Sequence, residues 1–128
     1  VMIEMRCLVE RTNGTHTRFD TGTANPTGFA AVTASGDYVY AYSSADNVVW
    51  RFDRTGGHAE IVAGRRGYVG TSPDGVKAAG SPIAPVLTVI VDAKGEPCFN
   101  DTELNSLRCV DARGALTTVV GRSPRADA

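Results

Sequence analysis

The chain contains an internal repeat, and this repeat limits the fold more than any other feature of the sequence. Asn47–Gly64 aligns with Asn105–Gly121, and both begin with Asn, carry Asp six residues later and end in a valine-rich run closed by Gly. A glycine-containing turn follows the Asp in each copy. Glycine near the end of such a short connection is typical of a β-hairpin, because the left-handed backbone there suits glycine. Each copy is therefore predicted to be a strand, a tight turn and a returning strand.

A second pair of short strands precedes each copy, so the predicted repeating unit has four strands. Ala31–Ser35 and Tyr38–Tyr42 correspond to Thr88–Asp92 and Glu96–Asn100, with a glycine-containing turn inside each pair. Met5–Phe19 is a fainter third copy that offers only an outer hairpin. The predicted strands are 29–35, 38–43, 48–53, 58–63, 86–92, 96–101, 106–111 and 115–120. The predicted organisation is an incomplete outer hairpin with a linker (1–28), a first unit (29–64), a connecting loop (65–85), a second unit (86–121) and a tail (122–128).

The composition indicates an all-β protein. Val and Thr number 15 and 13 against 5 Leu, while 14 Gly and 6 Pro divide the chain into short segments. β-branched residues fit the pleated surface of a sheet, and Gly and Pro mark its turns. Four-stranded antiparallel units repeated in series are typical of β-propeller blades. We therefore expect propeller blades, with a small β-sandwich of nine or ten strands as the alternative.

The second unit resembles an NHL repeat, the blade of one β-propeller family. Asp74-Gly75, followed by small residues and a proline, is similar to the connection between NHL blades. The first unit matches less well, because Ser43 stands where the second unit has Asp101. The residues that carry the resemblance in the second unit are Pro85–Asp92, Ala93–Gly95, Pro97–Asp101, Asn105–Arg108, Val110, Asp111, Gly114 and Thr118–Gly121. The resemblance implies an architecture and leaves the reaction, if there is one, undefined.

The number of units predicts an incomplete ring. Closed propellers typically have about 4–8 blades, and about three repeats are the minimum for a stable array. Two complete units and one hairpin do not reach a closed propeller. We expect the ring to be completed by a different chain, by further copies of this chain, or by a missing part of a longer protein. A chain that starts within a blade, at Val1, favours a different chain or a missing part.

Two of the three cysteines are predicted to face each other. If the hairpin 97–110 is centred between Glu103 and Leu104, Cys98 and Cys109 are directly opposed. They are either a disulfide or a pair of buried thiols packed as small apolar groups. No Cys-x-x-Cys or His-x-x-x-His spacing occurs, so no metal site or cofactor is predicted. An odd number of cysteines also leaves one thiol over.

Two sequence triplets match the acceptor pattern for N-glycosylation. They begin at Asn13 and Asn100. Such sites are modified in exported proteins, on the surface. Together with the cysteines, the triplets favour an extracellular or exported protein, although the compartment itself does not follow from the sequence.

The connecting loop is the predicted partner-binding surface. Loops longer than about 12–15 residues are uncommon and are often functional. This one carries charges and an aromatic residue of the kind found at protein interfaces. In a propeller, the connections between the second and third strands of each blade share a face with it. The candidate residues are Arg65, Arg66, Tyr68, Asp74 and Lys77 in the loop, with Asp46, Asn47 and Glu103 beside it. The alternative is that the loop only packs over the neighbouring blade.

These features predict a non-catalytic interaction or structural module whose partner is a protein or further copies of the chain. With 13 basic and 14 acidic residues, the net charge of −1 argues against nucleic-acid binding. No apolar run approaches the roughly 18 residues that span a membrane. The alternative is part of a propeller enzyme, a metal-dependent lyase or hydrolase with ligands at the central axis. The innermost predicted strands supply only Asp92 for such a site, so no catalytic residue is predicted.

Overall fold

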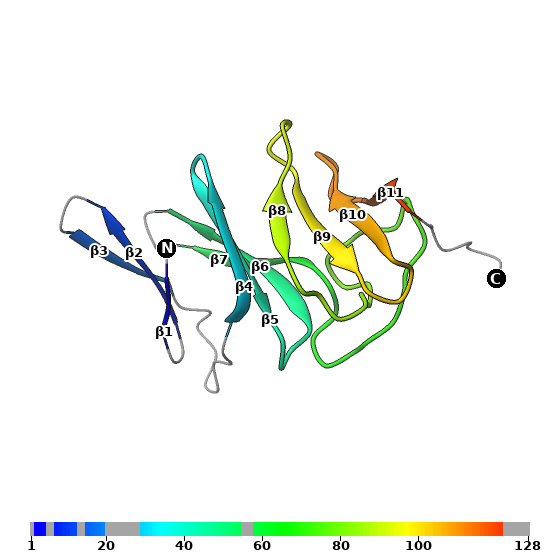
Figure 1. The fold of residues 1–128 in the computed structure, drawn as a ribbon, viewed down its shortest axis with the longest axis horizontal. Helices are drawn as coiled ribbons and strands as arrows, with labels where there is room; N and C mark the ends of the chain where they lie inside the picture. The colour runs from blue at the N-terminus through cyan, green and yellow to red at the C-terminus, as the bar shows by residue number, and fades with distance from the viewer. Residues whose placement is uncertain (1, 5–6, 13–14, 20–28, 55–57, 122–128) are drawn as a thin grey trace.

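The structure, a computed structural model, describes residues 2–4, 7–12, 15–19, 29–54 and 58–121, with side chains from residue 29 onward. These residues form strands and turns, so the predicted all-β fold is confirmed. The described part of the chain has no helix that is long and apolar enough to cross a membrane. The strands form three sheets, each built from consecutive strands, that lie beside one another in a row (Figure 1). The alternative β-sandwich would have two sheets, whereas the described strands form three.

The first sheet extends the hairpin that was predicted for Met5–Phe19. β2 (Cys7–Thr12) pairs antiparallel with β3 (Thr15–Phe19), as expected. A further strand, β1 (Met2–Glu4), pairs with the other edge of β2. The predicted hairpin is therefore part of a three-stranded sheet.

The second sheet corresponds to the first predicted unit. It contains β4 (Phe29–Ser35), β5 (Tyr38–Ser43), β6 (Val48–Asp53) and β7 (Ala59–Ala63), each antiparallel to the next. Aromatic and β-branched residues dominate the two central strands and favour this conformation. Gly36 adopts a left-handed φ of 57° in the short turn between the first two strands, where a side chain would be strained. The sequence thus predicted this sheet to within one residue at each strand end.

The third sheet corresponds to the second predicted unit. It contains β8 (Val89–Val91), β9 (Pro97–Asp101), β10 (Ser106–Val110) and β11 (Leu116–Val120), again in chain order. Its first strand is shorter than the predicted 86–92. The reason is that the backbone N–H groups of residues 87 and 88 donate to the side-chain oxygen of Asn100, 2.8 Å away in both cases. These N–H groups therefore donate to a side-chain oxygen, whereas in a longer strand they would donate to backbone carbonyl groups.

Equivalent residues of the two four-stranded sheets adopt the same backbone geometry. Asn47 and Asn105, the first residues of the two aligned copies, have φ values of 57° and 52°. Gly64 and Gly121, the last residues, have φ values of 97° and 92°. A Cβ on either glycine would lie 2.7 Å or 2.6 Å from the carbonyl oxygen of its own asparagine, which is a steric clash. The internal repeat of the sequence is therefore a repeat of the structure.

The two four-stranded sheets pack face to face in the same orientation. Alternate residues of a strand point to opposite faces of its sheet. Tyr40, Tyr42 and Val49 of the second sheet share a core with residues of the third, among them Phe99 and Leu116. We call this core the inter-sheet core. β4 and β8, the first strands of these two sheets, lie side by side (Figure 1).

The opposite face of the second sheet is buried as well. Val39, Val48, Trp50 and Phe52 form a separate cluster with Phe29. It lies on the face turned away from the third sheet, on the side where the sheet of β1–β3 is seen in Figure 1. The Trp50 and Phe52 rings stack with centroids 6.4 Å apart. The second sheet is therefore the central layer of the described structure.

Candidate interaction surface

The connecting loop packs against both four-stranded sheets. The N–H of Gly64 donates to the carbonyl of Ala78 at 3.0 Å, which ties the loop to the end of β7. Farther along, the N–H of Leu116 donates to the carbonyl of Val76 at 2.9 Å, which ties the loop to β11. The loop is therefore hydrogen-bonded to both four-stranded sheets.

Asp74 is part of this structural anchor. The guanidinium of Arg108, which is fully buried, donates to Asp74 Oδ1 at 3.0 Å. The hydroxyl of Thr118 donates to the same oxygen at 2.8 Å. A carboxylate that accepts these two bonds neutralises a buried charge. Asp74 therefore has a structural role, while its side chain, a candidate for the partner-binding surface, stays 41% exposed.

Asn47 also has a structural role. Its side-chain nitrogen donates to the carbonyl oxygens of Tyr68 and Ile83, at 3.0 Å and 2.7 Å, and it is buried. Its side-chain oxygen accepts a hydrogen bond from the hydroxyl of Tyr42. Burial raises the pKa of the Tyr42 hydroxyl above its usual value, so this donor stays protonated at neutral pH. Asn47 thus fastens the connecting loop and is not available to a partner.

The other loop candidates divide between two places. Arg66 forms an ion pair with Asp46 at 3.3 Å, and the guanidinium of Arg65 lies 4.1 Å from the centre of the Tyr68 ring. These four exposed or half-exposed side chains form one group. Lys77 is exposed elsewhere and lines a cleft between the sheets.

Glu103 lies in the turn between β9 and β10, and its side chain is exposed. Its backbone N–H donates to the side chain of Asp101 at 2.9 Å. This turn is equivalent to the one that holds Asp46 in the second sheet. Among the described interactions, Glu103 has no contact with the four side chains of that group (Arg65, Arg66, Tyr68 and Asp46).

The cleft between the sheets was not predicted. It has a volume of about 380 Å³ and lies between β5–β7 and the turns of the third sheet. Burial raises the pKa of the Tyr40 hydroxyl on its wall, and the nearby Arg51 guanidinium opposes that rise. Arg51 itself is ion-paired with Glu60. The lining also includes Lys77, Lys94, Glu96 and Asp111. No sequence motif joins these residues, because they come together only when the two sheets stack.

The outward face of the third sheet, turned away from the second, is apolar and exposed. Ile90 pairs with Cys98 and Val120 with Leu107, so alternation places these side chains opposite the inter-sheet core. The exposed large apolar residues on this side are Leu87, Ile90 and Val120. A hollow of about 320 Å³ on this side is lined by Leu87, Asn100, Asn105, Leu107 and Val120, among others. We call these residues the outward face.

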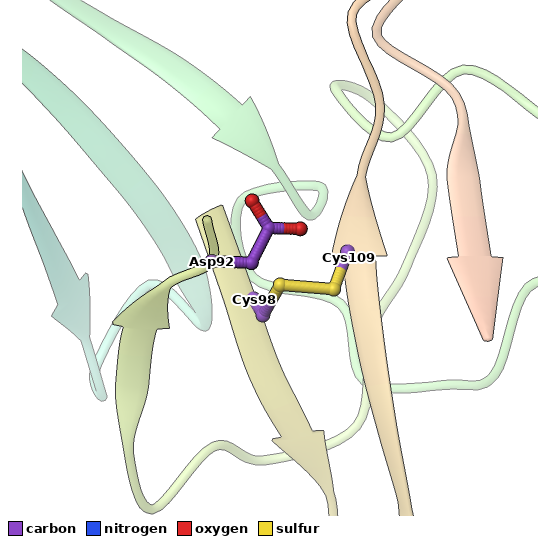
Figure 2. A group of neighbouring side chains, drawn as sticks. All are labelled: Asp92, Cys98 and Cys109. Carbon is purple, nitrogen blue, oxygen red and sulfur yellow. A yellow bond between two sulfur atoms is a disulfide. The ribbon is translucent and has the colours of Figure 1, made fainter. Parts of the chain in front are cut away.

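The two predicted facing cysteines are directly opposed. Cys98 pairs with Cys109 across β9 and β10, with the Cα atoms 4.0 Å apart. Of the two alternatives, buried thiols or a disulfide, the structure has the disulfide (Figure 2). The cystine lies on the side of the outward face, and both cysteines are buried. The side chain of Cys7 lies outside the part of the structure whose side chains are described.

Asn100 is held inside the fold. Its side-chain oxygen is fixed by the backbone N–H groups of Leu87 and Thr88, and the residue is half-buried within β9. This placement differs from the exposed loop in which a glycosylation acceptor is expected. The other candidate acceptor, Asn13, lies outside the described residues.

Comparison with known proteins assigns no family to the chain. No protein-family model matches the sequence, and a search of curated proteins found no match. The similarity to NHL repeats therefore rests on the residues given above and remains a prediction.

Asn47 and Asn105 make a matched pair for testing the anchoring of the loop. Asn47→Ala should lower the free energy of unfolding by about 1–3 kcal/mol more than Asn105→Ala, because only Asn47 satisfies two loop carbonyls. Both residues have positive φ, so the backbone strain of each substitution cancels in the comparison. Urea unfolding of the two variants measures the difference. Equal losses would show that the asparagine matters only for its backbone conformation.

Proposed function

We propose that this chain is a non-catalytic propeller segment that acts as an interaction or structural module. In this proposal, the outward face of the third sheet receives a further four-stranded sheet of the same kind. That sheet belongs to another chain or to a part of a longer protein outside this sequence. Burial of an apolar sheet face drives the association.

One observation carries the proposal: equivalent positions are covered in the second sheet and uncovered in the third. Val49 and Leu107 occupy the same position of the repeat; Val49 is 1% exposed, whereas Leu107 is half-exposed. Likewise Asn47 is buried beneath the connecting loop, whereas Asn105 is exposed. What covers the second sheet is the loop and the third sheet that follows it. A further loop and sheet would cover the third in the same way.

The repeat also defines the chemistry of the partner. The partner sheet would present large apolar residues, as Phe99 and Leu116 do toward the second sheet. Its leading segment would offer backbone carbonyl groups to the side-chain nitrogen of Asn105, as Tyr68 and Ile83 do to Asn47.

The enzyme alternative finds little support on the described inner strands. A metal centre at a propeller axis needs His, Asp or Glu from several innermost strands. β4 reads Phe-Ala-Ala-Val-Thr-Ala-Ser and β8 reads Val-Ile-Val, so neither described strand carries such a residue. The single candidate, Asp92, follows the end of β8.

A charge placed on the outward face tests the proposal. Val120→Asp should weaken association of the chain at least about tenfold, because burying an unpaired carboxylate at an apolar contact costs more than 1.4 kcal/mol. Val69→Asp is the matched control: Val69 is 63% exposed and Val120 64%, but Val69 lies in the connecting loop. Sedimentation equilibrium over a concentration series measures both. If the two variants associate equally, the outward face is not the contact.

A further inference from the structure

Three potential metal ligands converge on the outward side of the third sheet. They are the carboxylate of Asp92, just after β8, and the sulfur atoms of Cys98 and Cys109. One ligand atom from each lies within 4.8 Å of the other two (Figure 2). These residues are separated in the sequence by spacings that match no known ligand motif, which is why the sequence predicted no metal site.

The repeat itself does not require this cluster. In the second sheet, the positions equivalent to Cys98 and Cys109 hold Tyr40 and Arg51, and that sheet is well packed without a cystine. The cluster is thus an addition to one copy of the unit. Its side chains are also held by their surroundings: both cysteines are buried, and Asp92 Oδ1 accepts backbone N–H bonds from Lys94 and Glu96 at 2.9 Å.

We infer that, when the disulfide is reduced, Asp92, Cys98 and Cys109 bind one divalent metal ion of the zinc class. A dithiol supplies two electrons and its two protons and becomes a disulfide, and the S–S bond becomes two thiols. With a phosphine, the two protons come from water, whose oxygen is taken up as the phosphine oxide. The metal ion then displaces the two thiol protons and is bound by two thiolates and one carboxylate. The oxidised form has no thiolate to offer, so disulfide and metal exclude each other.

The geometry suits a tetrahedral ion. With usual zinc bond lengths, two sulfur ligands lie about 3.8 Å apart, and a sulfur and an oxygen ligand about 3.6 Å apart. Cys98 and Cys109 are directly opposed in neighbouring strands, and side chains at such positions can hold two sulfur atoms at this spacing. The backbone bonds to Asp92 orient its carboxylate, as hydrogen bonds around metal ligands generally do. Three protein ligands leave the fourth coordination position for water. Asp92 is half-exposed, so a metal ion can reach the site from the solvent at this residue.

Cadmium titration of the reduced chain tests this inference. The measurement uses a Cys7→Ser background, since Cys7 would otherwise add a third thiol. The chain is reduced with a phosphine, desalted without oxygen and titrated with Cd²⁺, while thiolate-to-cadmium charge-transfer absorption is followed in the ultraviolet. We expect one ion per chain in the reduced form and none in the oxidised form. Binding to the oxidised form, or no charge-transfer band in the reduced form, would overturn the site.

A matched pair of variants tests the role of the carboxylate. Asp92 and Asp111 occupy the same Asp-Ala-basic-Gly turn, and Asp111 Oδ1 also accepts two backbone N–H bonds, from Arg113 and Ala115. Asp92→Asn should weaken cadmium binding at least about tenfold, whereas Asp111→Asn should leave it unchanged. Equal cadmium affinities of the two variants would mean that the two thiolates bind the ion without the carboxylate, as they would in an unfolded chain. That result would refute the three-ligand site.

Discussion

Replacing Cys98 and Cys109 together by alanine is expected to lower the free energy of unfolding by about 3 kcal/mol. The cystine closes a loop of 11 residues in sequence separation, and the chain-entropy relation assigns a loop of this size a stabilisation near that value. Both cysteines are also buried, so truncation leaves a small cavity. Equilibrium unfolding in urea, with and without a reductant, measures the effect.

The reductant itself provides the control for this prediction. Reduction of the unaltered chain should produce most of the loss, and reduction of the double-alanine variant should produce none. If the double substitution and the reduction of the unaltered chain each lower the free energy of unfolding by less than about 1 kcal/mol, the hairpin is held by its strand pairing alone. That result would also show that the cystine does not reduce the conformational entropy of the unfolded chain by the amount that the entropy relation assumes.

Asp74→Ala is expected to destabilise the fold by about 2–3 kcal/mol, because it leaves the buried guanidinium of Arg108 without its acceptor. Two other nitrogen atoms of that guanidinium group, Nε and Nη1, already have no hydrogen-bond partner among the described atoms. The half-exposed position of Asp74 keeps the expected loss below that of a fully buried pair. Thermal or urea unfolding of the variant gives the value.

A second substitution separates the charge from the packing. Arg108→Met, alone or combined with Asp74→Ala, should leave the free energy of unfolding within about 1 kcal/mol of that of the original chain, because an apolar side chain of similar volume needs no acceptor. The double variant would then be more stable than Asp74→Ala alone. If Arg108→Met is as damaging as Asp74→Ala, the ion pair itself stabilises the contact between the connecting loop and the third sheet.

The strands could be predicted from the sequence because their signals are local. Turn glycines and β-branched runs fixed seven of the eight predicted strands of the two units to within one residue. The opposition of Cys98 and Cys109 followed from counting outward from one turn. The eighth strand was predicted too long, because the side chain of Asn100 takes the N–H groups that would have extended it.

The roles of the surface candidates could not be predicted, because they depend on contacts between distant segments. Asp74 reaches Arg108 across 34 residues, and Asn47 reaches Ile83 across 36. A polar residue in a loop has the same local sequence whether it meets solvent or anchors a neighbouring sheet. The same holds for Asp92, whose approach to the cystine depends on how β8 pairs with β9.

The central claim, that the stacked repeat is open at its outward face and receives a further sheet there, is tested most directly by the native mass of the chain. Native mass spectrometry under non-reducing conditions should give a particle heavier than the 13.5 kDa of one chain. Exact multiples would mean that copies of this chain complete the ring, and any other mass would mean that a different chain does. A 13.5 kDa monomer that unfolds cooperatively would contradict the claim, because the two repeats would then be stable without a further sheet.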